Sequence, residues 1–220
     1  MNYNFTWSWS RLKSYETCPK RYYHYDVVKD VQEETRPNEG LAAHRAYELR
    51  IRDGKKLPLG LTHHEPILAK LDALPGEHYA EQKLALTKDF KPTGFFSSNV
   101  WFRTVLDFCA IVGKTAAVVD YKTGKPATDT TQLQLMSATV MHYAPEVESV
   151  RARLLFLNHD KAESANFSRE DVSGIWAGIL PRVRRLQEAQ VEQEYPPKPS
   201  GLCVRYCSVT SCPFHGRGSR

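Results

Sequence analysis

The sequence predicts an α/β fold with a central mixed β-sheet flanked by helices. Strand-like apolar runs occupy the middle of the chain, and helix-like stretches lie before, between and after them. A length of 220 residues suits one domain with a substantial core. We therefore expect a single domain over residues 1–220.

The first elements are helical. Ser8 or Ser10 can cap a short helix that ends at Cys18-Pro19, and an aromatic, basic helix follows to about residue 26. A longer helix begins at Gly40, and a short one is expected over residues 66–74. A strand over residues 79–86 then precedes two strands joined by a turn at Gly113-Lys114.

The second half alternates between helices and strands. A helix over about residues 131–143 begins after Thr128-Asp129 and ends at Ala144-Pro145. Strands are expected at residues 150–157 and near 162–167. Ser168 and Asp171 have the spacing of a capping box, which opens a long helix to about residue 194.

The composition is that of a soluble globular protein, with 41% hydrophobic and 25% charged residues. No apolar segment has membrane-spanning length, and the N-terminus lacks the pattern of a signal peptide, so we expect a cytoplasmic protein. The 30 Lys and Arg exceed the 25 Asp and Glu, which gives a net charge of +5. This charge is compatible with nucleic acid as a partner but is not specific for it.

Charged residues follow two neighbouring apolar runs. Asp120 and Lys122 end one run with a single residue between them, and Asp107 follows the run Trp101–Leu106. Since only Gly113-Lys114 offers a turn, the two aspartates can meet across a hairpin. Carboxylates suit Mg²⁺ or Mn²⁺, and phosphodiester hydrolysis needs such a cation and an activated water. An exposed Asp–Lys pair is also common without any role, so the pattern alone leaves both interpretations open.

Other residues can complete this site. The Tyr121 carbonyl would add an oxygen ligand, and Lys122 would hold or activate the attacking water. His44 is a candidate nitrogen ligand that favours manganese, although a lone histidine on a helix is more often structural. Gln132 and Gln134, on the helix after the motif, can contact a phosphate or a base, or belong to a solvated face.

The N-terminal helices combine aromatic and basic residues. This combination suits single-stranded nucleic acid, whose bases stack on rings and whose phosphates pair with cations. The candidates for DNA binding are Arg11, Tyr15, Arg21 and Tyr22. Aromatic residues at helical spacing more often belong to a core, and the basic run at residues 182–185 is typical of a solvated face.

Five cysteines in a chain expected in the cytoplasm argue against a disulfide framework. Cys203, Cys207 and Cys212 lie close together, and Cys18 is the candidate for a fourth thiolate, because Cys109 is expected inside a strand. Four thiolates hold a zinc ion or a [4Fe–4S] cluster. One distant and three close cysteines favour the cluster, whereas His215 keeps a zinc site with three cysteines and one histidine open.

In their order along the chain, these motifs resemble a known family. They are WSWSRLKSYETCP, Gly40-x3-His44, Asp107, the segment DYKTG from Asp120, and LCVRYCSVTSCP near the C-terminus. The set is similar to RecB-type nucleases of the PD-(D/E)XK superfamily, and among them to iron–sulphur exonucleases of phages and of CRISPR adaptation systems. The resemblance implies a restriction-endonuclease-like core and a terminal lobe that an iron–sulphur cluster holds together.

The resemblance also implies roles for single residues. The metal ligands would be His44, Asp107 and Asp120, assisted by the Tyr121 carbonyl, with Lys122 as the catalytic lysine. Glu81 would help to line the site. Gln132 would be the glutamine of a Gln-x3-Tyr helix motif, in which Met136 stands where the family has tyrosine.

The resemblance assigns the cysteines as well. A [4Fe–4S] cluster would join the terminal segments, about residues 1–30 and 195–220. Its ligands would be Cys18, Cys203, Cys207 and Cys212. Their spacing of three and then four residues, where many relatives have two and then five, keeps zinc as an alternative.

We therefore expect a Mg²⁺- or Mn²⁺-dependent DNA exonuclease that hydrolyses single strands or DNA ends, in recombination, repair or phage DNA metabolism. One alternative is a nuclease that processes DNA in CRISPR adaptation with partner proteins. Another is a DNA-binding or partner-docking module without useful catalysis, at which Met136 hints. Besides DNA, the expected partner is a second copy of the chain or a protein of recombination or replication. We expect no contact with a membrane.

Overall fold

The computed structural model describes residues 5–31, 39–126 and 128–217. The chain forms two compact units. The first consists of residues 1–6 and 38–177, and the second of residues 7–37 and 178–220. The described helices include none with the length and apolar character needed to cross a membrane.

The first unit holds a sheet with the strand order β3-β2-β4-β5-β6-β7. Neighbouring strands run antiparallel except β5 and β6, which run parallel, so the predicted mixed sheet is confirmed. The strands are β2 (Glu77–Leu86), β3 (Pro92–Thr93), β4 (Phe102–Val112), β5 (Thr115–Lys122), β6 (Ser149–Phe156) and β7 (Lys161–Ser168). The turn between β4 and β5 lies at Gly113-Lys114, where Gly113 has a φ of 52° that favours glycine. This turn forms the hairpin that brings the ends of the two strands together.

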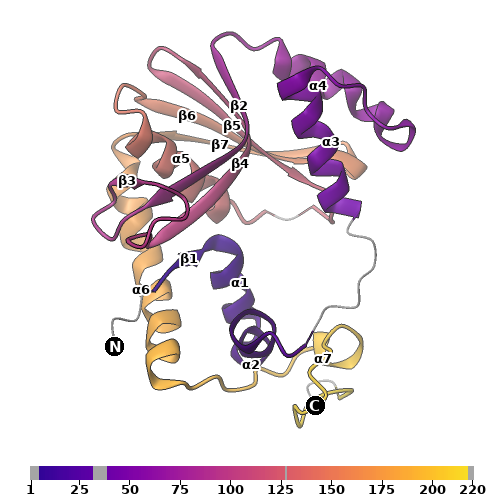
Figure 1. Ribbon diagram of the computed structural model, residues 1–220, viewed down its shortest axis with the longest axis vertical. Coiled ribbons are helices and arrows are strands. Elements are labelled where there is room, and N and C mark those ends of the chain that lie inside the picture. The colour runs from indigo at the N-terminus through magenta and orange to yellow at the C-terminus, as the bar shows by residue number, and fades with distance from the viewer. Residues whose placement is uncertain (1–4, 32–38, 127, 218–220) are drawn as a thin grey trace. The chain divides into compact units, whose positions relative to one another are not determined.

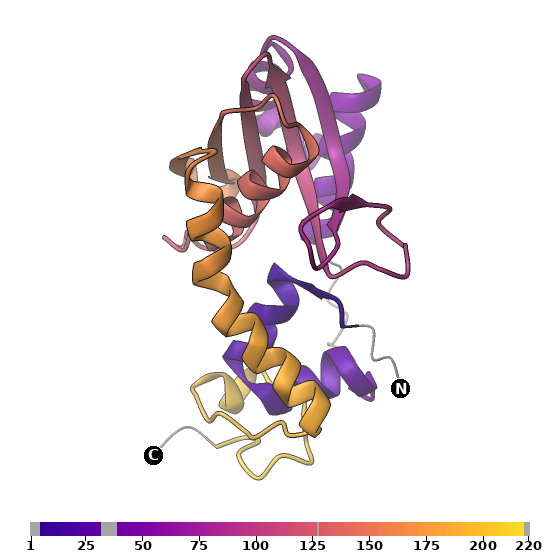
Figure 2. The same ribbon diagram turned by 90° about the vertical axis from the view of Figure 1, so that its left-hand side faces the viewer.

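Helices cover both faces of the sheet (Figures 1 and 2). The helix α5 (Thr131–Tyr143) lies on one face. The helices α3 (Glu39–Asp53) and α4 (Glu65–Asp72) lie on the other, with the 3-10 segments η2 (Leu59–His64) and η3 (Leu157–His159). Apolar side chains from both sides of the sheet form two cores, one under α5 and one under α3 and α4.

The end of α5 is fixed by a single arginine. The guanidinium of Arg169 donates to the carbonyls of Met141 and Ala144, each at 3.1 Å, and to that of Val147. The last carbonyls of a helix lack partners within the helix, so this side chain supplies hydrogen bonds at the helix end. The next helix, α6 (Asp171–Glu192), begins at the predicted capping box, where the Ser168 N–H donates to Asp171 Oδ2 at 2.7 Å.

The second unit combines both ends of the chain. Its N-terminal part contains β1 (Trp7–Ser8), α1 (Trp9–Thr17), α2 (Pro19–Tyr22) and the π-helix η1 (Tyr23–Val28), and its C-terminal part contains α6 from residue 178 and α7 (Leu202–Arg205). Ser8 Oγ caps α1 by accepting from the Arg11 N–H at 3.3 Å. A bidentate ion pair joins Arg182 to Glu16 at 2.7 and 2.6 Å. The two chain ends are therefore held together by direct polar contacts.

Candidate active site

Two residues that face each other, Glu81 and Asp107, interrupt the regular alternation of their strands. The register pairs on either side of them are Ala80 with Phe108 and Gln82 with Leu106. Leu106 belongs to the core under α5 and Phe108 to the core under α3, although residues two apart in a regular strand share a face. Glu81 has a φ of 51°, which residues other than glycine rarely adopt. Two carboxylates thus lie at a local irregularity of the sheet, a feature that clusters at functional sites.

His44 of α3 completes a group with these carboxylates. Its Nδ1 lies 3.2 Å from Asp107 Oδ1 and 3.8 Å from Glu81 Oε1. One donor atom from each of the three residues lies within 4.8 Å of the others, and no second group of this kind occurs among the described residues. Carboxylate oxygens suit Mg²⁺ and Mn²⁺, and an imidazole nitrogen is a common ligand of transition metals. The donor set therefore fits a divalent cation.

The electrostatics of this group favour a positive charge between the carboxylates. Hydrogen bonds to Asp107 and then to Glu81 raise the pKa of His44 to about 10, against the opposing effect of burial. The imidazole is therefore protonated at neutral pH when no cation is bound. A bound divalent cation would likewise place positive charge beside the carboxylates of Asp107 and Glu81.

Asp120, Lys122 and Gln132 form an adjoining network. The register of β4 and β5, continued by one pair, places Asp120 opposite Asp107. Gln132 Nε2 donates to Asp120 Oδ1 at 2.6 Å. Lys122 Nζ donates to Gln132 Oε1 at 2.8 Å and lies 2.6 Å from Asp120 Oδ2. The predicted catalytic lysine, aspartate and glutamine are thus brought together.

The Asp120 carboxylate is buried, and this changes its acidity. Burial and then the Asp107 carboxylate raise the pKa of Asp120 to about 6, while Lys122 opposes the rise. A bound cation would relieve the repulsion between the two carboxylates. Asp120 is not one of the three close donors, so its role as a metal ligand stays a prediction, whereas Glu81, weakly implied by sequence, is a member of that group.

Aromatic rings line the site on the α3 side. The Tyr121 N–H donates to Asp107 Oδ2 at 2.6 Å, which fixes this carboxylate, and the ligand role of the Tyr121 carbonyl stays a prediction. The buried Tyr121 ring packs edge-on against His44 and Tyr47, with centroids 6.0 and 5.1 Å apart. The Tyr47 hydroxyl is 2.8 Å from Nδ1 of the buried His64. Sequence analysis missed Tyr47 and His64, although Tyr47 follows His44 by three residues and so shares its helix face.

Met136 lies one turn after Gln132 and is 1% exposed. It belongs to the core under α5. A tyrosine hydroxyl buried at this position would need a hydrogen-bond partner, whereas methionine fills the space without one. The methionine is therefore compatible with an intact Asp120–Gln132–Lys122 network.

The residues predicted to bind DNA through the N-terminal helices differ in exposure. Tyr22 is 1% exposed, and Gln190 Nε2 donates to its hydroxyl at 2.6 Å, which favours the alternative that this ring belongs to a core. Tyr15 packs edge-on against Tyr22, and Arg21 lies over the Tyr25 ring, 4.2 Å from its centroid. The DNA-binding role of Arg11, Tyr15 and Arg21 stays a prediction.

The four predicted cluster ligands lie in the second unit and line one pocket. They are Cys18, Cys203, Cys207 and Cys212, all with free thiols. The N–H groups of Lys198 and Ser200 donate to Cys18 Sγ and Cys203 Sγ, each at 3.4 Å. In the described part of the chain, no three cysteine sulfurs lie within 4.8 Å of one another. The iron–sulphur cluster therefore stays a prediction.

Comparisons with known proteins are consistent with this arrangement. The family model of the PD-(D/E)XK nuclease superfamily matches residues 6–213. Among solved structures, a candidate exonuclease from Eubacterium rectale has a TM-score of 0.55 at 11% identity, with 99% of this chain and 90% of that chain covered. The structure of SSO0001 has a TM-score of 0.43 at 14% identity, with 96% and 87% covered. No curated protein matches the sequence. Because this family model matches most of the length of the chain, the chain belongs to the PD-(D/E)XK nuclease superfamily.

Proposed function

We propose that the protein is a metal-dependent DNA exonuclease of the RecB-like type that acts on single strands or at DNA ends. The observation that carries the proposal is the group of His44, Glu81 and Asp107 beside the network of Asp120, Gln132 and Lys122. The ordered motifs of RecB-like nucleases support DNA as the substrate. The similar fold of the protein from Eubacterium rectale, described as an exonuclease candidate, supports digestion from an end.

The chemistry follows from the positions of these side chains. Mg²⁺ or Mn²⁺ at His44, Glu81 and Asp107 would neutralise charge on the scissile phosphate and lower the pKa of the attacking water. Gln132 holds the Asp120 carboxylate in place, so that it can complete the ligand set. The Lys122 side chain is 34% exposed, and its ammonium can reach a water or an anionic oxygen at the edge of the site. It would orient the water and stabilise negative charge that develops during cleavage.

The test uses end-labelled single-stranded and duplex DNA with Mg²⁺, Mn²⁺ or EDTA. We expect cleavage only with a metal, and a loss of about 100-fold or more in Asp120→Ala and Lys122→Ala. Glu146→Ala, which removes an exposed carboxylate of the same unit, is the matched control and should cleave like the wild type. Intact DNA with the wild type, or equal cleavage by all variants, would show that the catalytic assignment is wrong.

We further propose that Cys18, Cys203, Cys207 and Cys212 hold a [4Fe–4S] cluster. The shared pocket and the two N–H donors to sulfur support a thiolate site. Along the chain, one distant and three close cysteines favour a cluster over a zinc ion, whose thiolates usually come as two close pairs. Protein purified without oxygen should be brown and contain iron and sulfide, whereas a colourless sample with zinc and no iron would exclude the cluster.

A further inference from the structure

Two adjacent phenylalanines occupy the tip of a tight turn after β3. The Ser97 N–H donates to the Gly94 carbonyl at 2.9 Å, which closes a β-turn with Phe95 and Phe96 at its two central positions. A side chain at Gly94 would lie 2.6 Å from Ser97 Oγ, so the serine hydroxyl would have to turn away. Gly, Pro, Asn, Asp and Ser are the usual residues of such turns. The two aromatic residues are therefore not explained by the turn itself.

One of these rings is exposed and both are flanked by cations. Phe96 is 79% exposed. The Arg103 guanidinium lies 5.3 Å from the Phe95 centroid and 5.8 Å from that of Phe96. Lys83 Nζ lies 6.0 and 5.9 Å from the same two centroids. The turn thus presents an exposed ring beside two positive charges.

Neither cation is neutralised by a carboxylate in the described part of the chain. Lys83 and Arg103 form no salt bridge there, and the buried Arg103 Nε has no hydrogen-bond partner. Lys88 and Lys91, with Asp89 between them, are exposed in the adjoining β2–β3 turn. The local charge is therefore positive and suits an anionic partner.

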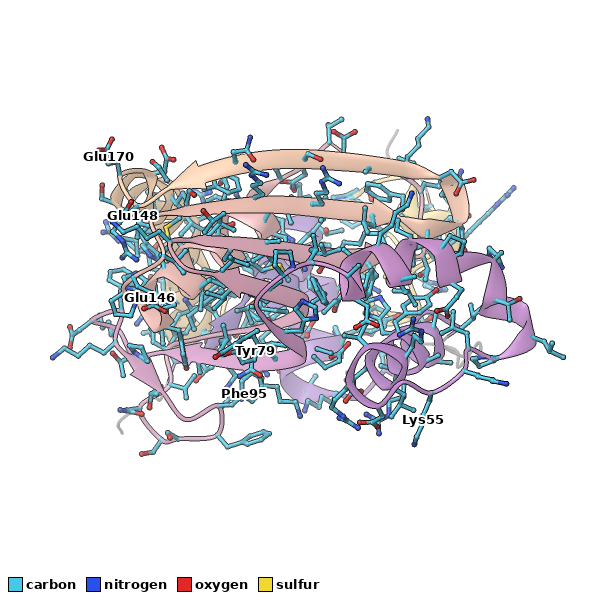
Figure 3. All side chains as sticks on the ribbon, turned by 90° about the horizontal axis from the view of Figure 1, so that it is seen from above. Lys55, Tyr79, Phe95, Glu146, Glu148 and Glu170 are labelled. Atoms are coloured by element: carbon cyan, nitrogen blue, oxygen red, sulfur yellow. The ribbon has the colours of Figure 1, made fainter. Side chains whose placement is uncertain are left out.

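The turn is held firmly by α5. The Tyr143 hydroxyl accepts from the Ala85 N–H at 3.0 Å and is 2.8 and 2.9 Å from the carbonyls of Ala85 and Thr93. Thr93 Oγ1 also donates to Asn99 Oδ1 at 2.8 Å across the base of the loop. Figure 3 shows Phe95 at the edge of the sheet formed by β2 and β3. The backbone at the base of the turn is therefore anchored to α5.

The same two strands carry the turn contacts and the candidate active site. On β2, Lys83 is two residues from Glu81, and on β4, Arg103 is four residues from Asp107. At about 3.3 Å per residue, these separations are about 7 and 13 Å. A single strand that contacts both places would therefore have its scissile bond within a few nucleotides of the turn.

We propose that Phe95, Phe96, Lys83 and Arg103 form a stacking platform for single-stranded DNA that leads to the active site. An unpaired base would stack on Phe96, while Lys83 and Arg103 pair with the neighbouring phosphates. This inference rests on the proposed nuclease function and specifies its substrate as a strand with unpaired nucleotides near the scissile bond. An exposed ring beside two cations without carboxylate partners matches the bases and phosphates of nucleic acid. A protein partner would instead need an apolar or acidic surface that fits this turn.

The test measures binding of a fluorescent single-stranded oligonucleotide in EDTA, so that cleavage cannot interfere. Phe96→Ala should weaken binding about fivefold to 100-fold, as expected for the loss of one stacked base. Phe96→Trp should retain binding, and Phe96→Leu, which is apolar without an aromatic face, should behave like alanine. Lys83→Ala should reduce the slope of log affinity against log salt concentration by about one, as expected for the loss of one phosphate contact. Tyr206→Ala, which removes a ring that is 70% exposed in the second unit, is the matched control and should bind like the wild type.

The outcomes separate the platform from the proposed nuclease. Unchanged binding in Phe96→Ala would overturn the platform. Full retention in Phe96→Leu would also overturn it, because an apolar side chain without an aromatic face would then be sufficient. Metal-dependent cleavage by the wild type would then still support the nuclease. If the wild type never cleaves DNA but Phe96→Ala weakens binding, the platform stands and the catalytic proposal fails.

Discussion

Glu81 combines a strained backbone with a ligand position. Its φ of 51° lies in the left-handed region, which costs an L-residue about 1 kcal/mol or more. The same conformation marks the break in strand alternation that places its carboxylate near Asp107 and His44. The backbone cost at this residue is therefore linked to the geometry of the candidate metal site.

This linkage predicts opposite effects of one substitution on stability and activity. Glu81→Gly should raise the free energy of unfolding by about 1 kcal/mol, because glycine adopts this φ without strain, and should lose metal-dependent cleavage. Glu81→Ala should lose cleavage equally and gain no such stability. Thermal unfolding without metal and DNA cleavage with Mn²⁺ measure the two effects. Equal stability of the glycine and alanine variants would show that the backbone conformation stores no strain.

Gln132 acts through its two neighbours. Its amide bridges Asp120 and Lys122, so its loss would leave both side chains free to reorient. We expect Gln132→Ala to reduce cleavage about 10- to 100-fold, in the range found for residues that orient metal ligands. A higher concentration of Mn²⁺ for half-maximal activity would distinguish this positioning role from general damage. The control is Glu146→Ala, which removes an exposed carboxylate of the same unit and should cleave normally.

At the scale of elements, α5 holds the β2–β3 hairpin through one hydroxyl. Tyr143→Phe removes the partner of the Ala85 N–H and of two carbonyls, at a position where the backbone is sheltered from water. The expected loss is about 1–3 kcal/mol of unfolding free energy. Denaturant titration measures it. Tyr206→Phe, which removes a hydroxyl from an exposed ring, should cost almost nothing.

The contact between α3 and η2 predicts a dependence of stability on pH. Burial lowers the pKa of His64 below 6.5, so the folded state binds fewer protons here than the unfolded state does. The neutral His64 therefore contributes to the free energy of unfolding in full above pH 6.5, and this contribution is lost as the pH falls below 6.5. His64→Gln should therefore lose less free energy of unfolding between pH 7.5 and 5.5 than the wild type does. The raised pKa values of His44 and Asp120 make the free energy of unfolding change with pH in the opposite direction. Both residues are present in the variant and in the wild type, so the difference between the two proteins reports His64 alone.

Regular elements could be predicted from the sequence because their signals are local. Pro145 and the Thr128-Asp129 pair gave the bounds of α5, and Gly113-Lys114 gave the hairpin that brings Asp107 and Asp120 together. The left-handed Glu81 and the exposed Phe95-Phe96 turn could not be predicted, because each depends on pairing between β2 and strands further along the chain. The burial of Tyr22 could not be predicted either, because its hydroxyl contacts Gln190, which is distant in sequence.

At the scale of the whole molecule, the two units differ in what stabilises them. The first contains the sheet and two apolar cores of its own. The second is assembled from both ends of the chain, and Cys18 on one end shares a pocket with three cysteines on the other. A cluster at these thiols would be a cross-link between the ends. The first unit would need no such cross-link.

This difference predicts that loss of the cluster unfolds one unit only. Cross-links between distant segments contribute about 2–5 kcal/mol, so Cys18→Ser should lower the melting temperature of the second unit by at least about 8 °C. Hydrogen exchange should then show protection lost in residues 7–31 and 178–217 and retained in β2 to β7. Iron chelation of the wild type should reproduce this pattern. Cys109→Ala, a buried thiol in β4, should keep its iron and instead weaken the first unit, because it leaves a cavity in the core under α5. Retained iron and protection in Cys18→Ser would show that this cysteine is no ligand, and loss of protection in both units would show that they unfold together.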